Sequence, residues 1–95
     1  MFIFVAMTIK GHIIEIFDPI QNTKIPKQEF GVEFESAGRL KQAKFTLKGD
    51  MVKNSDLHID QEIELEFELD PWRNKNVNNP QKPFYNHELR VTKIF

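Results

Sequence analysis

Apolar and acidic residues alternate without interruption along residues 61–70, Gln-Glu-Ile-Glu-Leu-Glu-Phe-Glu-Leu-Asp. A period of two is typical of a β-strand that buries one face and exposes the other to solvent. The acidic face carries four like charges, so we expect it to repel a polyanion. The strand should turn Ile63, Leu65, Phe67 and Leu69 into the core and Glu62, Glu64, Glu66 and Glu68 toward solvent.

The same kind of pattern, divided by turn residues, predicts four further strands and one helix. Ala37-Gly38 predicts a tight hairpin between the second and third strands. Asp50 is the expected cap of a short helix, and Asn54 and Ser55 make this helix a weak one. The expected strands are residues 8–18, 27–36, 39–48, 61–70 and 86–95, and the expected helix is residues 50–57.

The first strand is irregular. Gly11 near its middle predicts a bulge or a sharp bend. Ile14 and Ile16 conflict in parity with Ile13 and Phe17, as a bulge in the strand would produce. The sequence therefore leaves open which side of the strand carries Phe17.

The second and third strands should each have an apolar and a polar face. The inward residues are Phe30, Val32, Phe34, Ala43, Phe45 and Leu47, and the fifth strand adds Leu89 and Val91. The outward face presents Lys27, Gln42, Lys44, Thr46 and Lys48, together with Glu29, Glu33 and Glu35.

The order of three strands, a short helix and two strands is that of the OB-fold, a small Greek-key barrel. The glycine within the first strand and the position of the helix favour this all-β architecture. A plain β-sandwich or an SH3-like barrel would also accommodate five such strands.

Composition and charge narrow the function classes. The chain has 95 residues, enough for one domain, and no cysteine, which excludes disulfide and thiolate chemistry. The net charge is −1, but residues 1–49 carry seven basic and five acidic residues, against six and nine in residues 50–95. Local charge would therefore govern any phosphate binding. The apolar start is too short to span a bilayer, and we expect a cytoplasmic protein.

Nothing in the sequence predicts catalysis, so we expect no enzymatic activity, no cofactor and no metal. His12, His58 and His87 do not follow the spacing of metal ligands. The four glycines form no phosphate-binding loop.

From Met7 onward the chain resembles a family of short, uncharacterised bacterial OB-fold proteins related to single-stranded-DNA-binding proteins. The matching segments are MTIKGHIIEI, KQEF, KFTLKGD, IDQEIELEFEL and NHELRVTKIF. Lys48 replaces an aromatic residue that often precedes the Gly-Asp of KFTLKGD, and the loop after residue 70 is longer than expected. We therefore divide the chain into an apolar N-terminal extension, residues 1–6, and a single OB-fold domain, residues 7–95.

The resemblance implies a nucleic-acid-binding face on the second and third strands, flanked by the loop between the first and second strands and by the loop between the fourth and fifth. Basic side chains would follow phosphates, and exposed rings would stack on bases. Residues 71–83 contain no acidic residue, which suits a loop that closes over such a ligand. The expected binding residues are Lys24, Lys27, Arg39, Lys44, Lys48, Trp72, Arg73, Lys75, Lys82 and Tyr85.

The aromatic residues near this loop have structural alternatives. Trp72 either stacks on a base or caps the end of the barrel. Tyr85 either stacks or points inward with its hydroxyl at the rim, and Phe84 is more typical of a core residue.

We therefore expect a non-catalytic single-stranded-DNA-binding protein with little sequence preference, an accessory of DNA replication or recombination. RNA is a second candidate ligand, no membrane is expected as a partner, and the resemblance implies a homo-oligomer, a dimer or a tetramer. The alternative is an OB-fold module that binds a protein instead. The modest net charge and the glutamates of the second strand favour this alternative.

Overall fold

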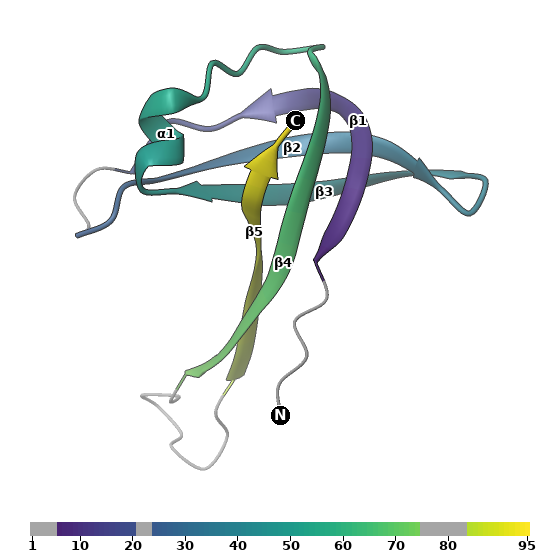
Figure 1. Cartoon of the computed structure of the whole chain (residues 1–95). Coiled ribbons are helices and arrows are strands. Elements are labelled where there is room, and N and C mark those ends of the chain that lie inside the picture. Colours follow the sequence, from purple (N-terminus) through teal and green to yellow (C-terminus); the bar gives the residue numbers. More distant parts are fainter. Residues whose placement is uncertain (1–5, 21–23, 75–83) are drawn as a thin grey trace.

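Five strands close into a barrel, with one short helix between the third and fourth (Figure 1). The computed structural model describes residues 6–20, 24–74 and 84–95, and only the backbone of residues 71–74 and 84–86. The strand order β1-β2-β3-β5-β4 confirms the predicted OB-fold. The elements are β1 (Met7–Ile16), β2 (Lys27–Ser36), β3 (Arg39–Lys48), α1 (Asp50–Asn54), β4 (Glu62–Asn74) and β5 (Phe84–Ile94).

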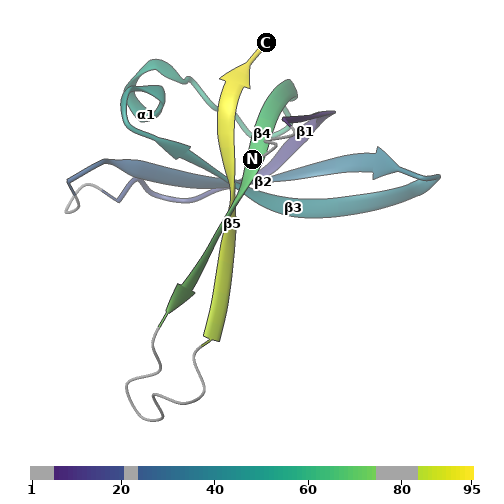
Figure 2. The ribbon, with the colours of Figure 1, turned by 60° about the horizontal axis from the view of Figure 1, so that its bottom comes forward.

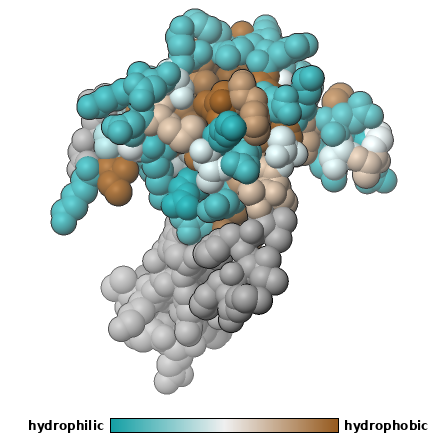
Figure 3. Space-filling view, viewed as in Figure 1, coloured by the Kyte–Doolittle hydropathy of each residue, from teal (hydrophilic) through white to brown (hydrophobic). Residues whose placement is uncertain are grey.

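The inward faces of the strands form one apolar core, as the alternation predicts. Phe45 lies at its centre, with its ring centroid 6.1 Å from that of Phe30 and 5.0 Å from that of Phe67. On the side seen in Figure 3, apolar atoms gather in the middle of the barrel and hydrophilic atoms surround them. The buried apolar residues are Ile13, Phe30, Val32, Phe45, Leu47, Ile63, Leu65, Phe67 and Val91.

β1 bends at a β-bulge that lies three residues beyond Gly11. The register with β2 shifts between Ile13 and Glu15, so the bulge expected at Gly11 is wrong in position. Gly11 serves a close approach of two backbones instead: a Cβ there would lie 2.3 Å from the Glu33 carbonyl oxygen. The parity conflict along β1 is confirmed, because the extra residue turns the strand over.

Of the two local features predicted from turn and cap residues, the hairpin turn is confirmed and the helix cap is wrong. Ala37 (φ 53°) and Gly38 (φ 73°) both adopt the left-handed conformation of a two-residue hairpin, as predicted. α1 is shorter than expected and ends at Asn54, and Asp50 does not cap it. Gly49 (φ 66°) occupies the cap position instead, because only glycine readily adopts its left-handed backbone there.

β4 and β5 continue past the barrel as a two-stranded arm, which consists of residues 70–74 of β4 and 84–88 of β5 (Figures 1 and 2). The expectation that β4 ends at residue 70 is wrong, because pairing with β5 continues to Asn74. The inward assignment of Leu69 is also wrong, since it is 50% exposed. Pairing between β1 and β4 stops at Met7 and Phe67, so among the described residues β5 alone pairs with β4 at Leu69.

The close approach at Gly11 predicts a strong effect of a single methyl group. Gly11→Ala should lower the free energy of unfolding by about 3 kcal/mol, the upper end of the usual cost of overpacking. Gly31→Ala is the matched control, because a Cβ at Gly31 would make only ordinary contacts at 3.5 Å. Urea denaturation of both variants measures the difference, and equal stabilities would contradict this role of Gly11.

Candidate nucleic-acid interface

A groove lies where the arm leaves the barrel. β3 and β5 pair in parallel at only two positions, Phe45 with Leu89 and Thr46 with Arg90. The part of β5 nearer the tip of the arm therefore diverges from β3 (Figure 2). A cavity of about 470 Å³ lies between residues of β2, β3 and β5. Its lining consists of Lys27, Glu29, Ala43, Lys44, Thr46, His87, Glu88 and Leu89.

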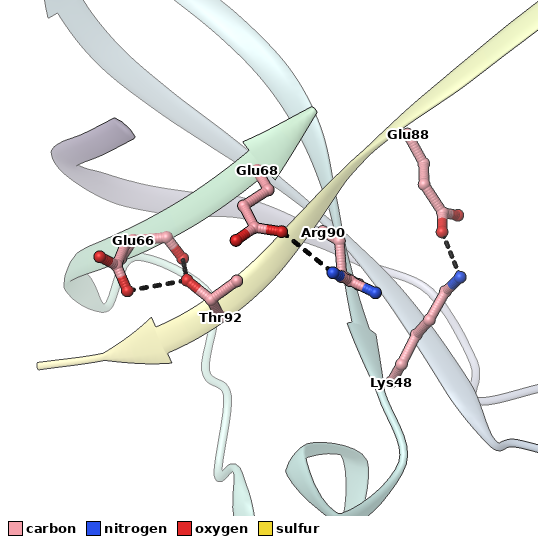
Figure 4. Close-up of polar contacts among 6 residues, drawn as sticks. All are labelled: Lys48, Glu66, Glu68, Glu88, Arg90 and Thr92. Atoms are coloured by element: carbon pink, nitrogen blue, oxygen red, sulfur yellow. Dashed lines mark hydrogen bonds and ion pairs between the residues drawn. The ribbon is translucent and has the colours of Figure 1, made fainter. Parts of the chain in front are cut away.

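Two ion pairs stand on the rim of this groove. The Lys44 ammonium lies 2.9 Å from a carboxylate oxygen of Glu29, across β2 and β3. The Lys48 ammonium contacts the Glu88 carboxylate on β5, as Figure 4 shows. The Glu88 side chain is only 11% exposed, whereas that of Lys44 is 59% exposed. The Lys48–Glu88 pair is therefore partly withdrawn from water and ties the arm to β3, while Lys44 remains accessible to a ligand.

Thr46 forms part of the groove without being exposed. Its position opposite Glu29 in the β2–β3 register places it on the outward side, as expected. It is nevertheless 1% exposed, so its expected accessibility is wrong. The cause is the parallel pairing with β5, which brings Arg90 alongside Thr46 and covers it.

The four glutamates of β4 lie outside the groove lining. Glu62 and Glu64 are exposed, as predicted, but the other two are half-buried and engaged with β5. Glu66 accepts a 2.9 Å hydrogen bond from the Thr92 hydroxyl, and Glu68 lies 3.0 Å from the Arg90 guanidinium (Figure 4). Part of the negative charge of this acidic face is therefore neutralised by Arg90, and Thr92 satisfies a further carboxylate oxygen.

The structure brings together some of the predicted binding residues and not others. Lys27 and Lys44 line the groove, and Lys48 reaches its rim through Glu88. Lys24 is exposed in the connection between β1 and β2. Arg39 begins β3 at the far end of the hairpin, about 30 Å along the strand from Lys48, so the groove does not include it.

The remaining predicted residues are Trp72, Arg73, Lys75, Lys82 and Tyr85. The backbone of Trp72 pairs with Asn86, and that of Arg73 with Tyr85, so Trp72 belongs to β4 and not to a loop after it. Lys75 and Lys82 lie outside the described residues. All of these assignments to nucleic-acid binding stay predictions.

Sequence reasoning missed the contribution of β5 to the groove. His87, Glu88 and Leu89 reach it because β5 adds to β3 in parallel, a pairing between segments more than forty residues apart. The local pattern gives the face of a strand but not its neighbour, so no signal in the sequence placed these residues beside Lys44.

Comparison with known proteins identifies the architecture. No protein-family model matches the chain, and no curated protein sequence matches it. Among solved structures, the mitochondrial single-stranded-DNA-binding protein Rim1 of S. cerevisiae is similar, with a TM-score of 0.72, 12% identity, and coverage of 99% of this chain and 95% of that one. The SSB domain of a Synechococcus protein is similar with a TM-score of 0.66 and 19% identity, over 94% and 91% of the two chains. The chain thus has the OB-fold of single-stranded-DNA-binding proteins, which confirms the predicted likeness at the level of the fold.

The described residues lack two kinds of feature. No helix among them is long and apolar enough to cross a membrane. No group of three or more potential metal ligands occurs in the same part of the chain.

The two ion pairs at the groove should differ in strength. A double-mutant cycle with Lys48→Met and Glu88→Gln should give a coupling free energy of about 1–3 kcal/mol, because removing one partner leaves a half-buried charge. The same cycle with Lys44→Met and Glu29→Gln should give about 0–1 kcal/mol, since that pair is solvated. Chemical denaturation of the single and double variants measures both, and equal coupling would refute the difference.

Proposed function

We propose that this protein binds single-stranded DNA without catalysing a reaction and with little preference for sequence. The observation that carries the proposal is the groove itself. It is open, lies between the β2–β3 face and the arm, and has Lys27 and Lys44 among its lining residues. The fold that creates it is shared with structures of single-stranded-DNA-binding proteins.

The arrangement of the lysines supports an anionic ligand. Lys27 and Lys48 stand directly opposite each other in the β2–β3 register. Like charges in that arrangement repel, and an anion between or beside them relieves the repulsion. Glu88 supplies one carboxylate to Lys48, and the backbone phosphate of a nucleic acid would supply a further negative charge.

The groove also contains carboxylates, which limit its affinity. A phosphate that approaches Lys44 must compete with Glu29, which is 2.9 Å away. Electrostatic binding that begins from a paired lysine gains less free energy than binding to a bare one. We therefore propose moderate affinity and a strong dependence on salt. RNA as a ligand, assembly into a homo-oligomer, a cytoplasmic location and a role in replication or recombination stay further parts of this proposal.

Lys44 provides the first test. Titration of a fluorescently labelled oligo-dT at several salt concentrations should give a linear fall of log K with log salt, with a slope of about −0.7 for each neutralised phosphate. Lys44→Gln should weaken binding and reduce the magnitude of that slope by about 0.7. Quenching of the intrinsic fluorescence of Trp72, the only tryptophan in the sequence, provides a second signal for the same titration.

Lys10→Gln is the control for this substitution. It makes the same change of charge at an exposed position of β1, opposite Glu64 and outside the groove lining. It should leave the slope unchanged. If wild-type protein does not bind the oligonucleotide even at low salt, the proposed function is wrong.

Glu29 provides a test of opposite sign. Glu29→Gln removes the carboxylate that competes for Lys44 and keeps the shape of the side chain, so binding of the same oligo-dT should tighten by about three- to tenfold at low salt. Glu35→Gln, on the same strand but outside the groove lining, controls for the change in net charge. Unchanged or weaker binding of Glu29→Gln would show that Lys44 does not meet phosphate.

The alternative function is a module that binds another protein. The observation in its favour is that both lysines on the groove rim already have carboxylate partners. Under this alternative the protein would ignore oligonucleotides, and its complex with a partner would be insensitive to salt and to Lys44→Gln.

A further inference from the structure

The bulge in β1 decides the direction of Phe17. Ile13 is fully buried, so a regular strand would also turn residues 15 and 17 into the core. The register shift between Ile13 and Glu15 reverses this alternation. Phe17 consequently lies on the outer surface of the barrel and is 41% exposed.

The backbone around this ring is fixed on both sides. The Phe17 N–H donates a 3.0 Å hydrogen bond to the Glu29 carbonyl oxygen, and the Phe17 carbonyl accepts one of 3.1 Å from the Gln28 side chain. These bonds hold the residue against β2 after β1 has formally ended at Ile16. An exposed aromatic ring is thus presented on an ordered backbone, at little entropic cost for binding.

A small cavity of about 200 Å³ lies beside Phe17. Gly31 forms part of its wall and has no side chain to fill it, while Gln42 and Lys44 extend toward it from β3. An aromatic ring next to an open space of this kind offers one of its surfaces to a flat ligand. The lining is completed by Ile14, Glu15 and Ala43.

This cavity adjoins the groove. Ala43 and Lys44 line both, so Lys44 stands between the groove beside β5 and the ring of Phe17. A single strand whose phosphate lies at Lys44 therefore has the cavity next to it for a base. We propose that Phe17 is a base-stacking residue and that the cavity beside it holds one nucleobase of a bound single strand. This inference rests on the proposed function and deepens it.

The charges of the cavity fit a base better than a phosphate. Glu15 lies in the lining, and its negative charge repels a phosphate but not an uncharged base. The ring and Ile14 supply apolar surface, and stacking on a ring does not depend on the identity of the base. The cavity thus agrees with a binder of low sequence preference.

Phe17→Leu tests the proposal, because it keeps an apolar side chain of similar size and removes the aromatic face. Binding of the labelled oligo-dT by this variant should be roughly 5- to 150-fold weaker than that of wild type, the range that corresponds to loss of one stacked base. Phe17→Trp should bind at least as well as wild type. Ultraviolet crosslinking of an oligonucleotide that contains 5-iododeoxyuridine, followed by mass spectrometry, should place a crosslink on Phe17.

Phe95→Leu is the matched control. Phe95 is also an exposed ring (61%), next to the Lys93 ammonium, and it is bonded to the backbone of Glu64, outside both cavities. This variant should bind like wild type, and thermal unfolding should show that both variants fold. If wild type binds and Phe17→Leu binds equally well, the stacking role of Phe17 is wrong and the proposed function stands. If wild type does not bind, the proposed function itself is wrong.

Discussion

The architecture depends on the short parallel contact between β3 and β5. Two residue pairs, Phe45 with Leu89 and Thr46 with Arg90, close the barrel that the antiparallel hairpins leave open. The contact is brief because the first residues of β5 lie in the arm, and β5 meets β3 only where the arm joins the barrel (Figure 2). A longer pairing would lay the arm along β3 and fill the groove. The same constraint therefore closes the core, with Phe45 at its centre, and opens the surface cavity.

The ion pairs on the rim of the groove connect this architecture to charge. Lys48 and Glu88 join β3 to the arm and help to fix the angle between them. Lys44 and Glu29 are more exposed and can exchange partners at little cost. One carboxylate thus ties the arm to β3, and the other pairs with an ammonium group in the groove. A surface of bare lysines would bind phosphate more tightly, but mutual repulsion would destabilise the folded barrel.

The local pattern of apolar and polar residues was sufficient to predict most of the strands, but it was insufficient to predict which residues form the groove. The bounds of β2 and β3 match the prediction, because their alternation and the Ala37-Gly38 turn agree with each other. The core phenylalanines also follow from parity. The burial of Thr46, the exposure of Leu69 and the extension of β4 did not follow, because each depends on which strand lies alongside, and that is set by pairing between distant segments.

The bulge at Ile14 shows that one extra residue in a strand decides whether the residues after it face the core or the surface. Phe17 reads as ambiguous because the sequence reveals a conflict of parity but not the residue at which the strand turns over. Once the shift lies between Ile13 and Glu15, Ile16 returns toward the core and Phe17 faces outward next to Gly31. The aromatic residue that the family resemblance led us to expect before Gly-Asp on β3 is a lysine here. Under the proposed function, the ring of Phe17 directly after β1 and the ammonium group of Lys44 would together supply the aromatic face and the positive charge that sequence-tolerant binding of a single strand requires.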